Sequence, residues 1–254
     1  MHRIILQTPS FTLYSYGLLM SAGFGIGCLY FLHATKKSSV SENLMINLCG
    51  GIILFSLLGA RVFYILAHAN YYFSHPLEIL RVWEGGMVFY GGLFFSLAFS
   101  FLYIKIYRLP LLIIADCAAP AIAFGLAIGR IGCFLNGCCY GIPSNFGFVF
   151  PPESPAGQTF PNQTLFPTQL LSSLNLFIIG FFLNWLRKNK KMQGKLLPFF
   201  LIFYSLHRFL VEFLRGDTDI LFAGLTLFQL VSIFLAGGSF FFLIFSSIFS
   251  KRPP

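Results

Sequence analysis

The chain has 254 residues, of which 57% are hydrophobic and only 10% are charged, and its net charge is +9. A soluble domain carries roughly a quarter charged residues, and the 34 phenylalanines are more than one soluble core would bury. The composition therefore excludes an ordinary soluble domain. It predicts an all-α, polytopic membrane protein, because helices satisfy their own backbone hydrogen bonds in lipid. Most of the basic residues lie in the connections between apolar segments, so we expect membrane lipid rather than nucleic acid as a partner.

Seven spanning helices are predicted in chain order, all in one integral membrane domain that covers residues 1–254. They lie near residues 13–33, 44–66, 87–106, 111–134, 168–187, 196–214 and 222–249. Most of these stretches come close to or exceed the roughly 20 residues that cross a hydrocarbon core about 30 Å thick. The first is too long for the apolar region of a signal peptide, so we interpret it as a retained span.

Basic residues separate the two sides of the predicted bundle. One set of connections holds every lysine and three arginines: Lys36, Lys37, Lys105, Arg108, Arg187, Lys188, Lys190, Lys191, Lys195, Lys251 and Arg252. Cytoplasmic connections of membrane proteins are rich in lysine and arginine. We therefore expect these connections to be cytoplasmic, with the N-terminus outside and the C-terminus inside.

The other basic residues are all arginines, and all lie outside or in the outer half of a predicted span: Arg3, Arg61, Arg81, Arg130, Arg208 and Arg215. A charge inside an apolar helix is expensive, so it needs a partner or a function. One interpretation is an internal ion pair with Glu84 or Glu212. The other is a site for an anionic group, because the guanidinium fork matches the oxygens of a phosphate.

Two glycine-rich stretches accompany these arginines. In residues 81–93, two Gly-Gly pairs flank residues 87–90; glycine permits close backbone approach and positive φ, whereas tight helix packing is the alternative. In residues 129–141, Arg130, Cys133 and Asn136 are spaced by three and would lie near one helix face. The cation and the amide could hold a phosphate and a glycerol hydroxyl, or Asn136 could belong to a helix cap.

Two further polar stretches lie on the same predicted side. Pro167 fits the first turn of the fifth span, and Gln169 is either a site amide or an interfacial one. Arg208 and Glu212 are four residues apart, and Arg215 follows one turn later along the same helix face. This spacing predicts a salt bridge that leaves one arginine with spare donors. The proline-rich connection 142–165 is either a lid or docking arm or a simple connector.

The six cysteines show no paired Cys-x-x-Cys pattern, so the sequence predicts no metal site. Cys28, Cys49 and Cys117 lie in apolar stretches and are interpreted as small buried residues. Cys133 could form a disulfide bond with Cys138 or Cys139, or all three could be packing residues.

These motifs, in this order, resemble the prolipoprotein diacylglyceryl transferase family. The resemblance spans nearly the whole chain: Tyr16-Gly17, Arg61, RVWEGGMVFYGGL (81–93), APAIAFGLAIGRIGCFLNGCCYG (119–141), FPTQL (166–170) and RFLVEFLRGD (208–217). It implies an enzyme of the bacterial cytoplasmic membrane that uses no cofactor or metal. Such an enzyme moves diacylglycerol from phosphatidylglycerol to the lipobox cysteine thiol of a preprolipoprotein, which forms a thioether and releases glycerol 1-phosphate.

The resemblance also implies site residues. The expected catalytic residues are Arg130, Tyr90, Arg208, Glu212 and Tyr16. The expected substrate-binding residues are Arg130, Asn136, Gly137, Gly141, Arg61, Gly91, Gly92, Gln169 and Arg215. The family pattern usually has His, Asn, Glu and Glu where this chain has Tyr90, Cys133, Cys138 and Ser172. We expect Arg130 with Arg208 or Arg215 to bind the phosphate.

The base that deprotonates the acceptor thiol stays open. Tyr90 occupies the matching position, His68 and His207 are substitutes, and the arginines alone could favour the thiolate. Two other functions compete with transfer. One is a diverged paralogue that binds lipid or lipoprotein without reaction. The other is a small transporter or flippase, which the scarcity of polar residues in the inner halves of the spans makes the weaker alternative.

Overall fold

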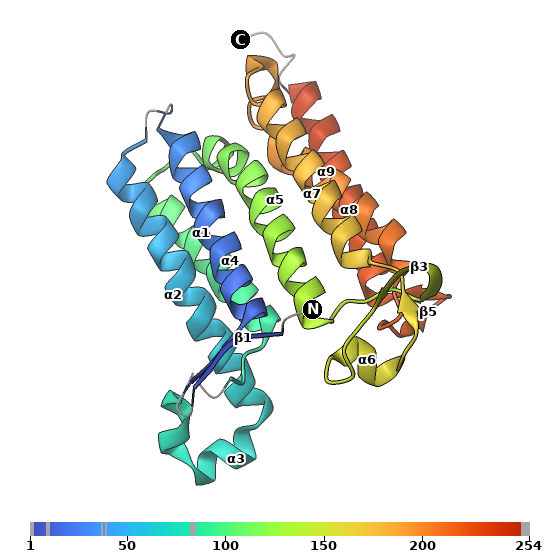
Figure 1. Cartoon of the computed structure of the whole chain (residues 1–254). Helices are drawn as coiled ribbons and strands as arrows, with labels where there is room; N and C mark the ends of the chain where they lie inside the picture. The colour runs from blue at the N-terminus through green and yellow to red at the C-terminus, as the bar shows by residue number, and fades with distance from the viewer. Residues whose placement is uncertain (1–2, 9–10, 37, 39, 82–84, 250–254) are drawn as a thin grey trace. The chain divides into compact units, whose positions relative to one another are not determined.

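The computed structural model describes residues 3–8, 11–36, 38, 40–81 and 85–249 (Figure 1). Its long helices are α1 (Ser15–Thr35), α2 (Glu42–Ala67), α4 (Phe89–Ile106), α5 (Leu111–Asn136), α7 (Thr168–Leu186), α8 (Leu196–Glu212) and α9 (Leu227–Phe249). Short helices fill some of the connections: α3 (Ala69–Ser74), η1 (Pro76–Leu80), α6 (Pro155–Thr159) and η3 (Lys190–Met192). Glu84, Lys37, Lys251 and Arg252, which entered the predictions above, lie outside the described residues.

Six helices of the described chain are long and apolar enough to cross a membrane: α1, α2, α4, α5, α7 and α9. Many large apolar side chains on them are exposed to the surroundings, as at Phe234 and Leu29, which are 78% and 69% exposed. Lipid is the solvent that tolerates such surfaces. The prediction of a mainly helical, multi-pass membrane protein is therefore confirmed. The number seven stays a prediction, because α8 has 17 residues and is not among the six.

Strands occur where the sequence analysis expected only helices and loops. Three antiparallel pairs form: β1 (Ile4–Thr8) with β2 (Phe11–Tyr14), β3 (Pro143–Val149) with β4 (Thr164–Leu165), and β5 (Ile220–Phe222) with β6 (Leu225–Thr226). The last predicted span was wrong at its start, because residues 222–226 belong to the β5–β6 hairpin. Ala223 and Gly224, at φ 50° and 76°, make its turn, and α9 begins only at Leu227.

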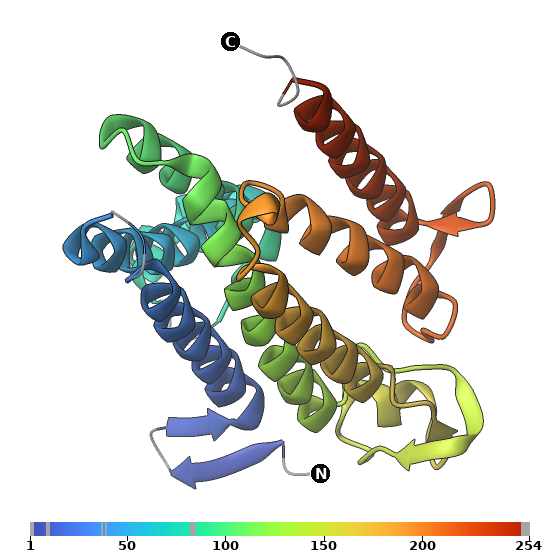
Figure 2. The same ribbon diagram turned by 90° about the horizontal axis from the view of Figure 1, so that it is seen from above.

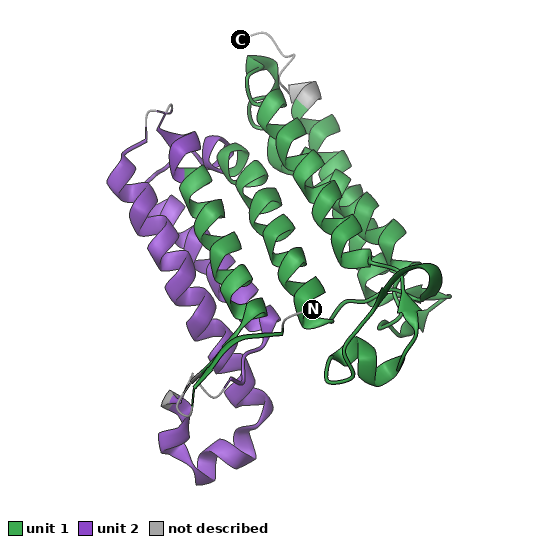
Figure 3. Ribbon diagram, in the orientation of Figure 1, with its two compact units in different colours: residues 1–31, 115–254 green, residues 32–114 purple. Residues whose placement is uncertain are grey.

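The chain divides into two compact units, residues 32–114 and residues 1–31 with 115–254 (Figure 3). In the unit 32–114, α2 packs against α4 through glycines. A Cβ atom added at Gly59 would lie 2.4 Å from the Gly91 carbonyl oxygen, and one at Gly92 would lie 2.8 Å from the Ser56 carbonyl oxygen. The Phe55 and Phe99 rings stack with centroids 4.6 Å apart. Gly91 and Gly92 thus serve close helix packing here.

The larger unit has its core between α5, α7 and α8, which run beside one another in Figures 1 and 2. Small residues on α5 meet large ones on its neighbours: Ala119, Ala123, Ala127, Leu176, Ile179, Leu183, Leu196 and Phe200. The buried Asp116 carboxylate of α5 accepts hydrogen bonds from the backbone N–H groups of Gly194 and Leu196. These bonds fix the turn that leads into α8.

The proline-rich connection 142–165 has a small core of its own. Tyr140, Phe150, Ala156 and Leu165 pack together and are all buried. The Ser154 hydroxyl accepts a hydrogen bond from the Gly157 N–H at 3.1 Å, which caps α6. This connection is therefore a packed element of the larger unit, and it closes over the end of α5.

Candidate functional site

The end of α5 turns sharply where the sequence is richest in glycine and cysteine. Gly137 and Cys139 both have positive φ, 73° and 57°, which only glycine adopts without cost. The Cys138 N–H donates to the Cys133 carbonyl at 3.1 Å. From the start of α7, the Gln169 side-chain amide donates to the Cys138 carbonyl at 2.9 Å, and the Thr168 hydroxyl donates to the Cys139 carbonyl at 2.7 Å. The turn is therefore rigidly held.

The next residues lie between two other segments. Gly141 forms an antiparallel bridge with Arg215, and the Ile142 N–H donates to the Leu214 carbonyl at 3.0 Å. A Cβ atom at Gly141 would lie 2.4 Å from the Phe166 carbonyl oxygen. Glycine is thus required at 141 because backbone crosses it closely. The three sequence motifs that begin at 129, 166 and 208 meet at this point.

Arg130 lies on α5 beside this meeting point. Its guanidinium has no hydrogen bond or ion pair with any residue that the structure describes. Tyr204, Cys139, Cys133 and Arg215 are its electrostatic neighbours. Tyr16 of α1 interacts electrostatically with Arg130, because α1 approaches α5 closely at Gly132, where an added Cβ would lie 3.5 Å from the Tyr16 carbonyl oxygen.

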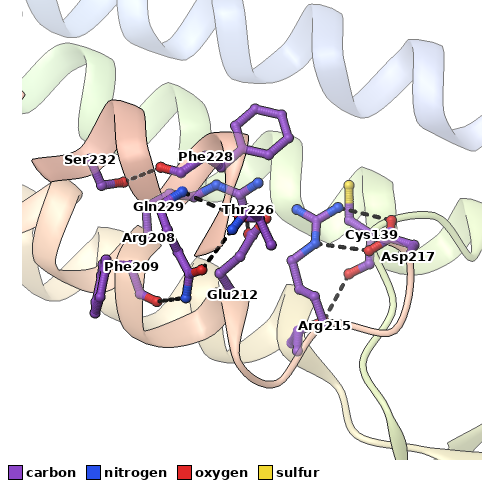
Figure 4. A network of polar contacts seen from close by, with 11 residues as sticks. Cys139, Arg208, Phe209, Glu212, Arg215, Asp217, Thr226, Phe228, Gln229 and Ser232 are labelled. Carbon is purple, nitrogen blue, oxygen red and sulfur yellow. Dashed lines mark hydrogen bonds and ion pairs between the residues drawn. The ribbon is translucent and has the colours of Figure 1, made fainter. Parts of the chain in front are cut away.

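Arg208 and Glu212 form the predicted ion pair on α8 (Figure 4). Arg208 Nη1 lies 3.0 Å from Glu212 Oε2, with side chains 10% and 0% exposed. This oxygen has no aligned hydrogen bond among the described residues, so the contact is mainly ionic. Glu212 Oε1 accepts from the Thr226 hydroxyl at 2.9 Å. The Arg208 guanidinium also lies over the Phe228 ring at 4.3 Å, so α8 and α9 are joined by one buried network.

Arg215 lies three residues beyond the end of α8, in the bridge to Gly141 (Figure 4). The prediction that it continues the helix face of Arg208 was therefore wrong. Its Nε and Nη2 atoms each donate to one Asp217 carboxylate oxygen at 2.8 Å, a bidentate pair. Its Nη1 atom is in no hydrogen bond with the part of the chain that is described. The arginine that the sequence predicted to keep spare donors beside the Arg208–Glu212 salt bridge is thus Arg215, through Nη1; Arg130 is a second arginine with unused donors, outside that prediction.

Arg61, Tyr90, Gly91 and Gly92 belong to the unit 32–114. Arg61 is 7% exposed and donates to the carbonyls of a single loop: Glu78 at 2.7 Å, Ile79 at 3.1 Å, Arg81 at 3.3 Å, Gly85 at 2.7 Å and Gly86 at 3.3 Å. Its guanidinium therefore holds that loop in place. Two carboxylates were expected as possible ion-pair partners of this arginine. Glu84 lies outside the described residues, and Glu212 pairs with Arg208. Tyr90 is 54% exposed near the start of α4.

Three thiols meet at the turn after α5. The Sγ atoms of Cys133, Cys138 and Cys139 all lie within 4.8 Å of one another, and all three cysteines are free. Hydrogen bonds from the Cys133 and Cys138 thiols, and then the charges of Arg215 and Arg130, lower the pKa of the Cys139 thiol. Asn136 also contacts Cys138. The disulfide bond that the sequence allowed between Cys133 and Cys138 or Cys139 is therefore not formed.

The fold and the site define a class: a multi-pass membrane protein that gathers arginine donors and thiols at the ends of its helices. The sequence model of prolipoprotein diacylglyceryl transferases matches residues 3–245. The phosphatidylglycerol–prolipoprotein diacylglyceryl transferase of Fusobacterium nucleatum is 32% identical over 96% of this chain and 97% of its own length. Those of Clostridium perfringens and Cupriavidus metallidurans are 34% and 37% identical, over 89% and 81% of this chain and 88% and 77% of their own lengths.

The chain therefore belongs to the prolipoprotein diacylglyceryl transferase family. The match runs through all the motifs that meet at the turn after α5.

Proposed function

We propose that the chain transfers the diacylglyceryl group of phosphatidylglycerol to the lipobox cysteine thiol of a preprolipoprotein. A thioether forms, and glycerol 1-phosphate leaves. The observation that carries the proposal is Arg130, a cation at the meeting point of the family motifs whose donors are unused by the described residues. Such a group is suited to a phosphate, because charge-assisted hydrogen bonds to phosphate oxygens are strong and directional. Family membership supports the reaction.

The proposed roles follow from the contacts. Arg130 and the Nη1 atom of Arg215 bind the phosphate and stabilise the charge that develops as it leaves. Asn136 and the backbone at Gly137 and Gly141 line the same turn and contact the glycerol part.

Other residues position this machinery. Arg208 with Glu212 fixes α8 against α9, and Gln169 holds the cysteine turn. Tyr16 contacts the reacting groups from α1. Arg61, Gly91 and Gly92 shape the unit 32–114, and Tyr90 stays the candidate base because of its place in the second Gly-Gly motif.

The proposal includes seven spans in the bacterial cytoplasmic membrane. With 17 residues, α8 is about 26 Å long at 1.5 Å per residue, at the lower end of the roughly 17–25 residues that span a bilayer. The two charged residues of α8, Arg208 and Glu212, have opposite charges and form an ion pair. Seven spans and the lysine-rich connections give an outside N-terminus and a cytoplasmic C-terminus. The site then faces the outer leaflet.

The test is thioether formation by the purified full chain in phosphatidylglycerol proteoliposomes with a lipobox peptide, followed by mass spectrometry. We expect diacylglyceryl addition by the wild type. Arg130→Ala should lose about 10²–10³-fold in rate, the effect of removing one preorganised donor to a developing anion. Arg187→Ala is the matched control, since Arg187 lies at the opposite end of α7 from the site motif.

Two outcomes would count against the proposal. Full activity of Arg130→Ala would exclude its phosphate role. A folded wild type that adds no lipid to the peptide would exclude transfer, and it would favour the diverged paralogue that the departures at Tyr90 and Cys133 suggest. Tyr90→Phe in the same assay tests the base, and unchanged activity would remove Tyr90 from that role.

A further inference from the structure

The turn between α7 and α8, residues 187–195, is called the basic turn below. It lies at the opposite end of α7 from β3 and the candidate site (Figure 1). It holds five basic side chains and no acidic one: Arg187, Lys188, Lys190, Lys191 and Lys195. A hollow of about 220 Å³ adjoins it, lined by Trp185, Leu186, Lys188 and Asn189. We propose that the hollow binds the phosphate head group of an anionic phospholipid from the leaflet on that side of the membrane.

No described residue neutralises the lysines of the basic turn. They form no ion pair within the part of the chain that the structure describes, whereas Lys36 pairs with Glu42 at 3.0 Å. Arg187 is different, because its guanidinium lies over the Tyr30 ring at 5.8 Å and so joins α7 to α1. Like charges held close together repel one another, and a nearby anion offsets that repulsion. The lysines, rather than Arg187, are therefore the cations that a ligand meets.

The backbone of the basic turn is held in place before any ligand binds. At its end, the Asp116 carboxylate accepts hydrogen bonds from the backbone N–H groups of Gly194 and Leu196. This acid is thus engaged by backbone and is not a counter-ion of the lysines. In the middle, the Asn189 side-chain oxygen accepts from the Lys191 N–H at 3.0 Å and caps η3. A preformed turn lowers the ordering cost of binding a head group.

The apolar side of the hollow points to a lipid as the occupant. Trp185 is 63% exposed, and tryptophan is enriched where a membrane meets water because its ring is apolar and its N–H is polar. Its ring stacks on Phe182 with centroids 5.9 Å apart. Ile178 and Phe182 are exposed on the same face of α7, four and seven residues before the indole. Acyl chains can therefore lie along this face while the head group occupies the hollow.

The charges select the kind of head group. Phosphatidylcholine and phosphatidylethanolamine carry a cationic amine next to the phosphate, which the lysines repel, whereas an anionic head group has no such cation. Lysine is a compact charge with rotatable donors on a flexible stem, so several lysines can turn toward one phosphate. Each lysine near a membrane surface strengthens binding to anionic lipid about fivefold. The indole and the apolar face of α7 make that phosphate part of a lipid rather than a free ion.

The fluorescence of Trp185 can report the occupant directly. The sequence has two tryptophans, so Trp83→Phe leaves Trp185 as the only one. In phosphatidylcholine proteoliposomes of the full chain, a small fraction of phosphatidylglycerol with brominated acyl chains should quench this fluorescence saturably. The same fraction of brominated phosphatidylcholine should quench it much less. A lipid at the candidate site does not interfere, because Thr168 at that end of α7 is about 26 Å away at 1.5 Å per residue and bromine quenches only on close approach.

Lysine variants in this single-tryptophan chain test the charges. Lys188→Gln should lower the relative affinity for phosphatidylglycerol over phosphatidylcholine about fivefold, the effect of one lysine near a membrane surface. Adding Lys190→Gln and Lys191→Gln should bring the loss to about 100-fold. Lys36→Gln is the matched control, since its ammonium is already paired with Glu42 and lies outside the basic turn. It should keep the full preference.

The outcomes separate this site from the proposed function. Equal quenching by the two brominated lipids would overturn the inference, as would a preference that the three lysine substitutions leave unchanged. Displacement of the brominated lipid by inorganic phosphate, beyond that caused by chloride of equal ionic strength, would assign the hollow to a soluble anion and overturn the lipid. A chain that shows the lysine-dependent preference but makes no thioether would support this site and contradict the proposed function.

Discussion

The Arg208–Glu212 pair should behave as one structural unit that binds α8 to α9. In Glu212→Leu, the Arg208 charge stays buried without its carboxylate, which costs about 3–5 kcal/mol in folded proteins. The Thr226 hydroxyl also loses its acceptor. In the double variant Arg208→Met/Glu212→Leu, no charge remains, and such replacements are often neutral or stabilising. The expected coupling energy is therefore about 3 kcal/mol or more.

The measurement is a double-mutant cycle of unfolding free energies, followed by tryptophan fluorescence as SDS is added to the purified chain in mild detergent. The exposed pair of Lys36 with Glu42, 3.0 Å apart with side chains 56% and 53% exposed, is the control. Exposed pairs contribute about 0–1 kcal/mol. If the double variant is as unstable as the sum of Arg208→Met and Glu212→Leu, or if Glu212→Leu costs no more than Glu42→Leu, the reasoning from burial is wrong.

Three further changes test contacts that hold the two units in shape. Arg61→Lys should expose the loop at 78–86 to limited proteolysis, because an ammonium cannot reproduce the guanidinium's bonds to carbonyls on several sides. Gly141→Ala should lower the free energy of unfolding by about 1–3 kcal/mol, because its Cβ would overlap the Phe166 carbonyl; Gly25→Ala, with nothing within 4 Å, should have no such cost. Asp116→Ala should speed amide hydrogen exchange at residues 194–196 by removing their acceptor, and unchanged exchange would contradict that role.

The spans were predictable because hydropathy acts over many residues at once. The fifth predicted span, residues 168–187, is found as α7 at Thr168–Leu186. The start of α9 was not predictable in this way. Leu221, Phe222 and Leu225 are as apolar as the helix that follows, so composition extends the helix through them. Only the turn at Ala223–Gly224, with its positive φ values, separates hairpin from helix.

Within the candidate site, local contacts were predictable and distant ones were not. The spacing of four residues placed Glu212 beside Arg208. It could not show that Thr226 would complete the carboxylate's contacts from β6, because that partner comes from a different element. The bidentate pairing of Arg215 with Asp217 was missed even though the two residues are near neighbours in the sequence. The helix was expected to continue to residue 214, whereas the chain leaves it after Glu212 and turns Arg215 toward its near neighbour.

The arginines of the motifs differ in whether other residues of the chain occupy their donors, and this difference singles out one candidate for binding a ligand. Arg61 is used by backbone carbonyls, Arg208 by Glu212, and most of Arg215 by Asp217. A positive charge with no counter-ion is unfavourable in a membrane helix, and Arg130 has no partner among the described residues. Of these four, its charge is therefore the one whose surroundings are completed by an anion from outside the chain. In the proposed function, the phosphate of a membrane lipid supplies that anion at the place where the thiols lie.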